Sequence, residues 1–112
     1  MIYVKINGNL YPAVINGKLV DNDWDKRDSK AITLEMDYAT ALSLFVDGLV
    51  WNIVMSVDRE QEDGSIVTDF EEYDNSEYDV AGPITDNRNG TVTVKMGKAT
   101  AQELLAVITG GN

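Results

Sequence analysis

The stretch DNDWD at residues 21–25 is typical of the start of a calcium-binding loop, because its carboxylates alternate along the chain. Such a loop continues with a glycine in the sixth position and a bidentate glutamate in the twelfth, but Lys26 and Ile32 stand there. Lys26 and Arg27 would also repel a cation. The preferred interpretation is a solvated loop from which Trp24 folds back onto the core. The candidate metal ligands are Asp21, Asp23 and Asp25, and we expect no cofactor.

Paired carboxylates are also the residues that cleave glycosidic bonds, one as an acid and the other as a base or nucleophile. The candidate pairs are Glu71 with Glu72, and Asp21 with Asp23 beside Trp24. Nothing in the sequence fixes the separation within either pair, and a chain with 19 acidic residues contains many such pairs. A carboxylate-based hydrolase of cell-wall sugars is therefore the least favoured of three hypotheses on function.

Other catalytic chemistries lack their residues. The chain contains neither cysteine nor histidine, which removes thiolate nucleophiles, Ser-His-Asp triads and the commonest neutral metal ligand. The spacings GxxxxGK[ST] and GxGxxG, which cradle phosphates, do not occur. We expect a protein that is not an enzyme.

Charge is distributed unevenly along the 112 residues, whose formal net charge is −10. Residues 1–48 hold seven acids and five bases, whereas residues 49–112 hold twelve acids and four bases. Ten carboxylates lie between Asp58 and Asp79, where Arg59 is the only base. This excess argues against direct binding of nucleic acid or of an anionic membrane.

The acidic stretch is interspersed with the aromatic residues Phe70, Tyr73 and Tyr78. One hypothesis is that it forms a projecting hairpin over residues 58–79 that binds a basic partner or imitates a nucleic-acid backbone. The other is that the charges keep an exposed hairpin soluble and block edge-to-edge pairing. The candidate interaction patch comprises Glu60, Glu62, Asp63, Asp69, Glu71, Glu72 and Asp74.

Alternating apolar and polar residues predict antiparallel strands that begin near Ile2, Ile32, Trp51 and Val92. Their apolar faces are Ile2/Val4/Ile6, Ile32/Leu34/Met36, Trp51/Ile53/Met55/Val57 and Val92/Val94/Met96. Four dipeptides that favour positive φ predict hairpin turns between strands: Asn7-Gly8, Asn16-Gly17, Asp63-Gly64 and Asn89-Gly90.

Two segments have helical spacing instead, and each is amphipathic enough to cover one face of a sheet. The first is capped by Asp37 or Thr40 and followed by Gly48; the second starts at the capping box Thr100-Ala-Gln-Glu103 and ends at Gly110-Gly111. Their apolar positions are Ala39, Leu42, Phe45 and Val46, and Ala101, Leu104, Leu105 and Ile108. Together these patterns predict a single α+β domain over residues 1–112, with antiparallel hairpins and two short helices.

An internal echo relates the two parts of the chain. Residues 32–44 and 92–104 are identical at six of thirteen aligned positions, including Thr33/Thr93 and Met36/Met96. One interpretation is a duplicated β-β-β-α unit with halves 1–48 and 49–112 around a pseudo-two-fold axis, the acidic residues 58–77 being an insertion in the second half. The other is that any strand leading into a capped helix selects such residues.

Three phrases carry a family resemblance that covers most of the chain: DNDWDKRDSKAITLEM, YDNSEY and ITDNRNGTVTVKMGK. The chain resembles small uncharacterised proteins encoded in prophages of Firmicutes, near tail and baseplate genes. The resemblance implies that the gene lies near phage tail and baseplate genes. It implies no particular reaction and assigns no catalytic residues to this chain.

The first hypothesis on function is therefore a structural or accessory protein of a tailed-phage particle, which contacts other phage proteins and forms a homo-oligomer. The second is the acidic binding module, whose partner is a basic phage or host protein. The start of the chain, IYVKI after Met1, lacks a basic region followed by a long apolar run, and no apolar run approaches the about 20 residues of a membrane span. These features predict a protein that is made in the cytoplasm and has no membrane association. The resemblance implies that this is the cytoplasm of a bacterial host, and in the first hypothesis the protein is then assembled into the virion.

Overall fold

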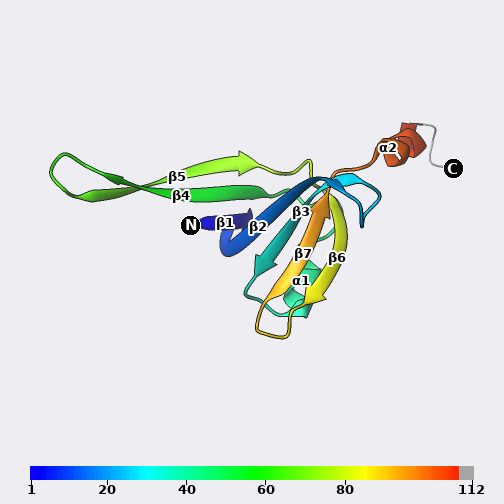
Figure 1. The fold of residues 1–112 in the computed structure, drawn as a ribbon, viewed down its shortest axis with the longest axis horizontal. Coiled ribbons are helices and arrows are strands. Elements are labelled where there is room, and N and C mark those ends of the chain that lie inside the picture. The colour runs from blue at the N-terminus through cyan, green and yellow to red at the C-terminus, as the bar shows by residue number, and fades with distance from the viewer. Residues whose placement is uncertain (109–112) are drawn as a thin grey trace.

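Seven antiparallel strands and two short helices make up the structure, a computed structural model that describes the backbone of residues 1–108 and the side chains of residues 1–105 (Figure 1). The strands join in one sheet in the order β5-β4-β1-β2-β3-β7-β6. The elements are β1 (Ile2–Ile6), β2 (Asn9–Asp21), β3 (Arg27–Leu34), α1 (Tyr38–Leu44), β4 (Asn52–Glu60), β5 (Ile66–Asp74), β6 (Val80–Asp86), β7 (Val92–Gly97) and α2 (Ala101–Ile108). The predicted antiparallel, sheet-rich architecture with two short helices is confirmed.

Strand β2 is shared between two groups of strands. Its residues 9–12 pair with β1, and its residues 13–21 pair with β3. The core gathers side chains from both groups and from α1, which packs against β6 and β7. The apolar faces predicted for β1, β3 and β7 are confirmed by its buried members, which include Val4, Ile6, Ile32, Leu34, Val92, Val94 and Met96.

Three of the four predicted hairpin turns are confirmed. Gly8, Gly64 and Gly90 have φ values of +80°, +82° and +87° in the turns after β1, β4 and β6. The turn predicted at Asn16-Gly17 is wrong, because this dipeptide lies inside β2, where Gly17 pairs with Lys30 of β3. Long-range pairing extends the strand past the local turn signal, and the chain reverses instead at residues 22–26.

The two helices differ in what they cover. Asp37 caps α1 by accepting a hydrogen bond from the Thr40 amide at 2.7 Å. The predicted apolar face of this segment is confirmed only at Phe45, which is buried in the core together with Ala41, while Leu44 is half-buried. The other three positions predicted as apolar contacts, Ala39, Leu42 and Val46, are exposed.

The prediction that the second helix covers a sheet face is wrong. The capping box itself is confirmed, because the Thr100 amide donates to Glu103 Oε1 at 2.8 Å and the Glu103 amide donates to Thr100 Oγ1 at 3.2 Å. After it, α2 extends away from the sheet and leaves Leu104 and Leu105 more than half exposed (Figure 1). The predicted end at Gly110-Gly111 and the side chain of Ile108 lie outside the described residues.

The strands of the internal echo, β3 and β7, are neighbours in the sheet. Thr33 pairs with Thr93, and their hydroxyl oxygens lie 3.0 Å apart. A two-fold rotation about this pair would exchange residues 32–34 with residues 92–94, the positions that the echo aligns. The second half is not one three-stranded meander, however, because its β4–β5 and β6–β7 hairpins lie at opposite ends of the sheet. The duplication stays a prediction.

Two extensions make the molecule elongated, with extents of 63 × 33 × 26 Å. The Cα radius of gyration is 16.6 Å, whereas a compact chain of this length has about 13 Å. One extension is α2, and the other is the β4–β5 hairpin (Figure 1). No helix within residues 1–108 is long and apolar enough to cross a bilayer.

Candidate interaction surface

The β4–β5 hairpin, residues 52–74, projects from the body of the molecule and is called the arm below (Figure 1). Only its root is held by another strand, since β1 pairs with residues 52–55 of β4 and the Ser56 amide donates to the Met1 carbonyl at 2.9 Å. Asp69 is half-buried and every other residue of β5 is exposed. A projecting acidic hairpin is thus confirmed, but it spans residues 52–74 instead of the predicted 58–79, and most of its surface faces solvent.

The tip of the arm is ordered by local hydrogen bonds. The Gln61 amide donates to the Ser65 carbonyl at 2.8 Å, and Gly64 takes the left-handed conformation. Asp63 Oδ1 accepts hydrogen bonds from both the amide and the hydroxyl of Ser65, at 2.9 and 2.6 Å. These bonds favour the carboxylate and lower the pKa of Asp63 from its ordinary value. The tip therefore needs no contact with the body to keep its shape.

The arm carries eight carboxylates and one arginine. Glu72 contacts Lys5 of β1 at 3.0 Å, which lowers the pKa of Glu72, and Asp69 contacts Arg59 at 2.7 Å. Within residues 1–108 the other six have no cation within salt-bridge distance. They are Asp58, Glu60, Glu62, Asp63, Glu71 and Asp74.

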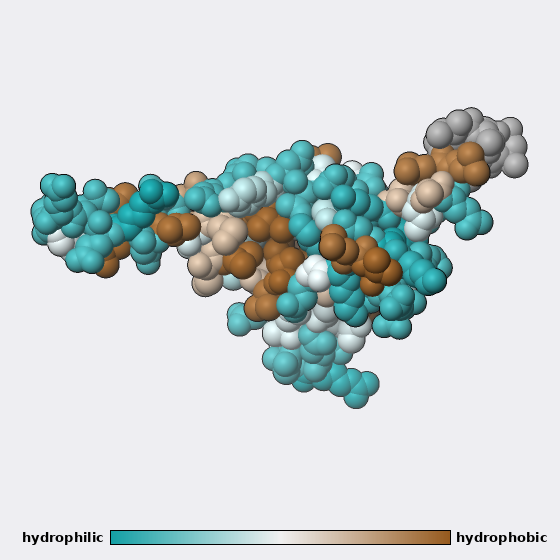
Figure 2. Space-filling model, turned by 45° about the horizontal axis from the view of Figure 1, so that its top comes forward, coloured by the Kyte–Doolittle hydropathy of each residue, from teal (hydrophilic) through white to brown (hydrophobic). Residues whose placement is uncertain are grey.

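Large apolar side chains lie among these carboxylates. Ile66 is 68% exposed and Phe70 is 61% exposed, and both belong to the same face of the hairpin because they are four residues apart in one strand. Val67 and Tyr73 are also exposed, on the other face. Figure 2 shows a mostly hydrophilic arm with separate hydrophobic groups along it. Ile66 and Phe70 therefore present apolar groups beside carboxylates on one face of the arm.

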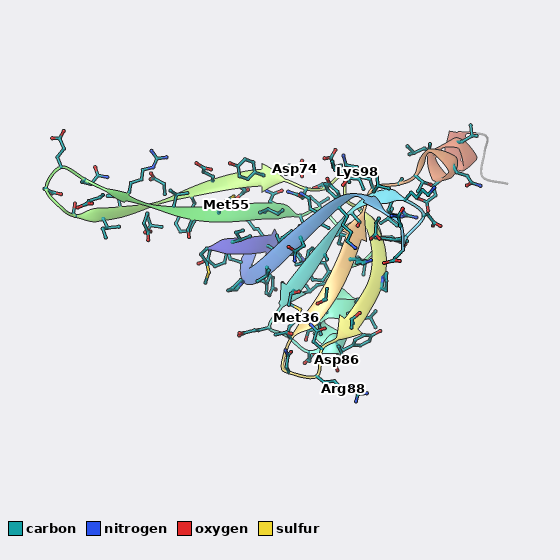
Figure 3. All side chains as sticks on the ribbon, in the orientation of Figure 1. Met36, Met55, Asp74, Asp86, Arg88 and Lys98 are labelled. Carbon is teal, nitrogen blue, oxygen red and sulfur yellow. The ribbon has the colours of Figure 1, made fainter. Side chains whose placement is uncertain are left out.

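The structure brings all seven residues of the predicted patch onto the arm but divides them between its surfaces. Glu60, Glu72 and Asp74 belong to the face that carries Phe70, Asp69 and Glu71 belong to the opposite face, and Glu62 and Asp63 lie in the turn. The side chains project to both sides of the ribbon (Figure 3). The sequence analysis did not include Ile66 and Val67 in the patch. Both follow the predicted turn at Asp63-Gly64 in a β-branched run, and this position was the signal that they belong to the hairpin.

Tyr78, which the sequence grouped with the aromatic residues of the acidic stretch, is buried at the root of the arm. The ammonium groups of Lys30 and Lys98 lie 4.5 and 5.1 Å from its ring centre. Its hydroxyl donates to Asp28 Oδ2 at 3.1 Å, and burial raises the pKa of Tyr78. Lys30 also donates to Asn75 Oδ1, next to the end of β5, and burial lowers the pKa of Lys30. This cluster clamps the end of β5 to β3.

The predicted metal ligands do not form a metal site. Asp21 is fully buried and accepts hydrogen bonds from Lys95 Nζ and Ser29 Oγ, both at 2.9 Å. These bonds, that from Lys95 first, lower the pKa of Asp21 to about 2. Asp23 is exposed, and Asp25 contacts Arg27 instead. Within the part of the chain that the structure describes, no three acidic residues lie close enough to hold an ion.

Trp24 does fold back, as predicted, and lies against the backbone of two strands. A Cβ atom added at Gly82 of β6 would lie 2.7 Å from its ring, and one added at Gly97 of β7 would lie 2.8 Å from it. The Arg27 guanidinium lies over the ring, 4.3 Å from its centre, and binds Glu103 through two hydrogen bonds at 3.0 and 3.2 Å. Arg27 thereby ties the first turn of α2 to the body.

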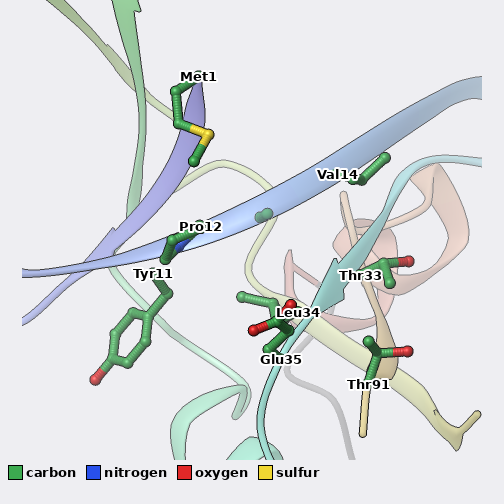
Figure 4. A pocket seen from close by; sticks show the side chains of 9 residues that line it. Met1, Tyr11, Pro12, Val14, Thr33, Leu34, Glu35 and Thr91 are labelled. Atoms are coloured by element: carbon green, nitrogen blue, oxygen red, sulfur yellow. The ribbon is translucent and has the colours of Figure 1, made fainter. Parts of the chain in front are cut away.

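Neither carboxylate pair suggested for glycosidic cleavage shares a cleft. Glu71 and Glu72 are consecutive in β5 and point to opposite faces, and Asp21 is buried against Lys95 while Asp23 faces solvent. The cavity in Figure 4, of about 480 Å³, is lined mainly by apolar groups such as Tyr11, Val14 and Leu34. Glu35 is the only carboxylate among its lining residues.

The arm is therefore the strongest candidate for a functional surface, because it is the part of the described chain that combines projection, unpaired charge and exposed apolar groups. Comparison with protein-family models, with curated proteins and with solved structures found no match to this chain.

Proposed function

We propose that the protein is a non-enzymatic structural or accessory component that works through protein–protein contacts made by its arm. The observation that carries this proposal is the arm itself, a regular hairpin that contributes little to the core yet exposes Ile66 and Phe70 among unpaired carboxylates. Ile66 and Phe70 offer apolar contacts and the neighbouring carboxylates offer charged ones, a combination that a protein interface can use. The resemblance to prophage proteins encoded near tail and baseplate genes supports a role in a phage particle.

An acidic module that imitates nucleic acid is the second candidate. It is supported by the six carboxylates of the arm that have no cation partner within residues 1–108. The distribution of these groups favours a protein contact over mimicry, since Asp58, Glu71 and Asp74 are spread over two faces and apolar groups interrupt them. A basic protein surface with its own apolar residues fits this arrangement better than a surface selected for phosphates alone.

Particle composition tests the proposal. Mass spectrometry of particles released after prophage induction in the bacterium that carries this gene should detect the chain. A variant with Glu60→Gln, Glu62→Gln and Glu71→Gln should be incorporated less, without a lower melting temperature. A matched control removes three exposed carboxylates of the body by Asp23→Asn, Glu35→Gln and Asp86→Asn, and should be incorporated normally. A protein that is monomeric in solution and missing from particles would rule out the assembly role.

A further inference from the structure

The outer edge of β5 presents unpaired backbone groups at defined positions. The Asn75 amide donates to the Trp51 carbonyl at 2.9 Å, and the Gln61 amide donates to the Ser65 carbonyl at 2.8 Å. Both contacts lie in the register of the β4–β5 pair, in which bonded pairs alternate with non-bonded ones. The odd-numbered residues of β5 therefore bond to β4. The residues whose N–H and C=O groups point away from β4 are Ile66, Thr68, Phe70, Glu72 and Asp74.

This edge is suited to accept another strand. All nine residues of β5 pair with β4 without a shift in register, so the pattern of outward backbone groups is regular. It contains neither proline nor lysine, the residues that commonly protect an edge strand from pairing. An incoming strand would bond to the five outward residues and would lay its alternate side chains beside Phe70 on one face and Glu71 on the other.

A second copy of the chain is a poor occupant of the edge. The antiparallel register that uses all nine residues of β5 in both copies places Asp69 opposite Glu71 of the other copy, and symmetry repeats this contact. Each arm would also bring eight carboxylates and only one arginine to the contact. Like charges that face each other directly across two strands destabilise their pairing.

We propose that β5 binds an extended, basic segment of another protein, which adds to the sheet as a further strand. The segment would carry lysine or arginine opposite Glu71, which has no cation partner within residues 1–108, and apolar side chains opposite Ile66 and Phe70. Backbone hydrogen bonds then supply the geometry of the complex, and the charges select the partner. This inference rests on the proposed function, because it specifies how the arm makes its contact.

Amide exchange on the intact protein tests the inference directly. The probe is a synthetic nine-residue peptide in which lysine and valine alternate, and exchange is followed by NMR with and without it. In the free protein the amides of Thr68, Phe70 and Glu72 should exchange rapidly, and bound peptide should slow them roughly tenfold or more. The amides of Asp69 and Glu71, already bonded to β4, should change little. Peptide that binds without slowing the even-numbered amides would make the contact purely electrostatic and overturn the inference.

A matched pair of variants provides a second measurement. Thr68→Pro removes an outward N–H next to the centre of the edge, whereas Thr68→Val retains it, and both remove the hydroxyl that donates to Asp58 at 2.8 Å. The proline variant should bind the peptide roughly tenfold more weakly than the valine variant. Protection of the Asp69 and Glu71 amides in both variants would show that the hairpin is intact. Equal binding by the two variants would refute strand addition.

Two further outcomes separate this inference from related ones. If the even-numbered amides become protected in the free protein as its concentration rises, a second copy occupies the edge, and the proposal of a basic partner is wrong. If the peptide protects these amides but the chain is missing from induced particles, strand addition stands and the assembly role fails.

Discussion

The two outermost strands of the sheet, β5 and β6, differ in whether other parts of the chain contact their outer edges. The edge of β6 is partly occupied: the Ala81 amide donates to Asp47 Oδ1 at 2.8 Å, the Asp79 carbonyl just before the strand accepts from the Gly48 amide at 2.8 Å, and Pro83 lies within the strand. Its register also shifts between Ala81 and Ile84. The edge of β5 has none of these devices over its nine residues.

The contrast indicates that only one of the two outer strands, β5, leaves its backbone groups fully available for pairing. Loops, a proline and a bulge protect the edge that belongs to the body, where uncontrolled pairing would disturb the core. The arm is left regular and is guarded by negative charge alone, which repels a second copy but attracts a basic segment. The difference between β5 and β6 is thus a difference between a strand that completes the fold and a strand that is free for contact.

The largest effect is expected where β6 meets Trp24. Gly82→Val places a side chain 2.7 Å from the indole ring, so Trp24 must leave the backbone of β6 or the strand must move. We expect a loss of about 1–3 kcal/mol in the free energy of unfolding, measured with urea. Gly17→Ala is the control, because its added Cβ would lie 4.0 Å from the Ser29 carbonyl, and it should stay within about 1 kcal/mol of the wild type. Equal losses would mean that the Trp24 contact does not hold β6.

The second prediction compares how stability depends on a buried carboxylate of the body, Asp21, and on an exposed carboxylate of the arm, Glu62. The pKa of Asp21 is about 2 in the folded protein and near 3.8 in the unfolded chain, so its contribution to stability is complete above pH 3.8 and is lost as the pH falls toward 2. Asp21→Asn should lower the urea midpoint at pH 7, and the gap to the wild type should narrow over that acidic range. Glu62→Gln, in the exposed tip of the arm, should leave the midpoint unchanged. A gap that is constant with pH would contradict the ion pair with Lys95.

The smallest effect on stability is expected within β5. Phe70→Ala removes a ring that is 61% exposed, so the free energy of unfolding should change by at most about 0.5 kcal/mol. Binding of the basic peptide should nevertheless weaken. A loss above about 1 kcal/mol in urea unfolding would mean that Phe70 packs within the protein, and the contrast between the two edges would then be weaker than we infer.

Local signals in the sequence predicted much of the fold. Alternation found the apolar faces of β1, β3 and β7, positive-φ dipeptides found three turns, and the Thr100–Glu103 capping box marked the start of α2. The acidic run predicted the arm, because so many carboxylates cannot be buried. Local signals failed at Asn16-Gly17, where pairing with β3 overrides the turn, and at α2, whose apolar spacing does not determine where the helix lies.

By itself, the sequence determined which residues alternate, which turns are tight and which stretch must remain solvated, because these properties depend on neighbours a few positions away. Tertiary structure decided the order of the strands, the pairing of Thr33 with Thr93, and the contact of Asp47 with the edge of β6 while β5 stays open. These features depend on contacts between residues that are far apart in the chain. An edge strand is defined by the neighbour that it lacks, and local sequence patterns do not record that neighbour.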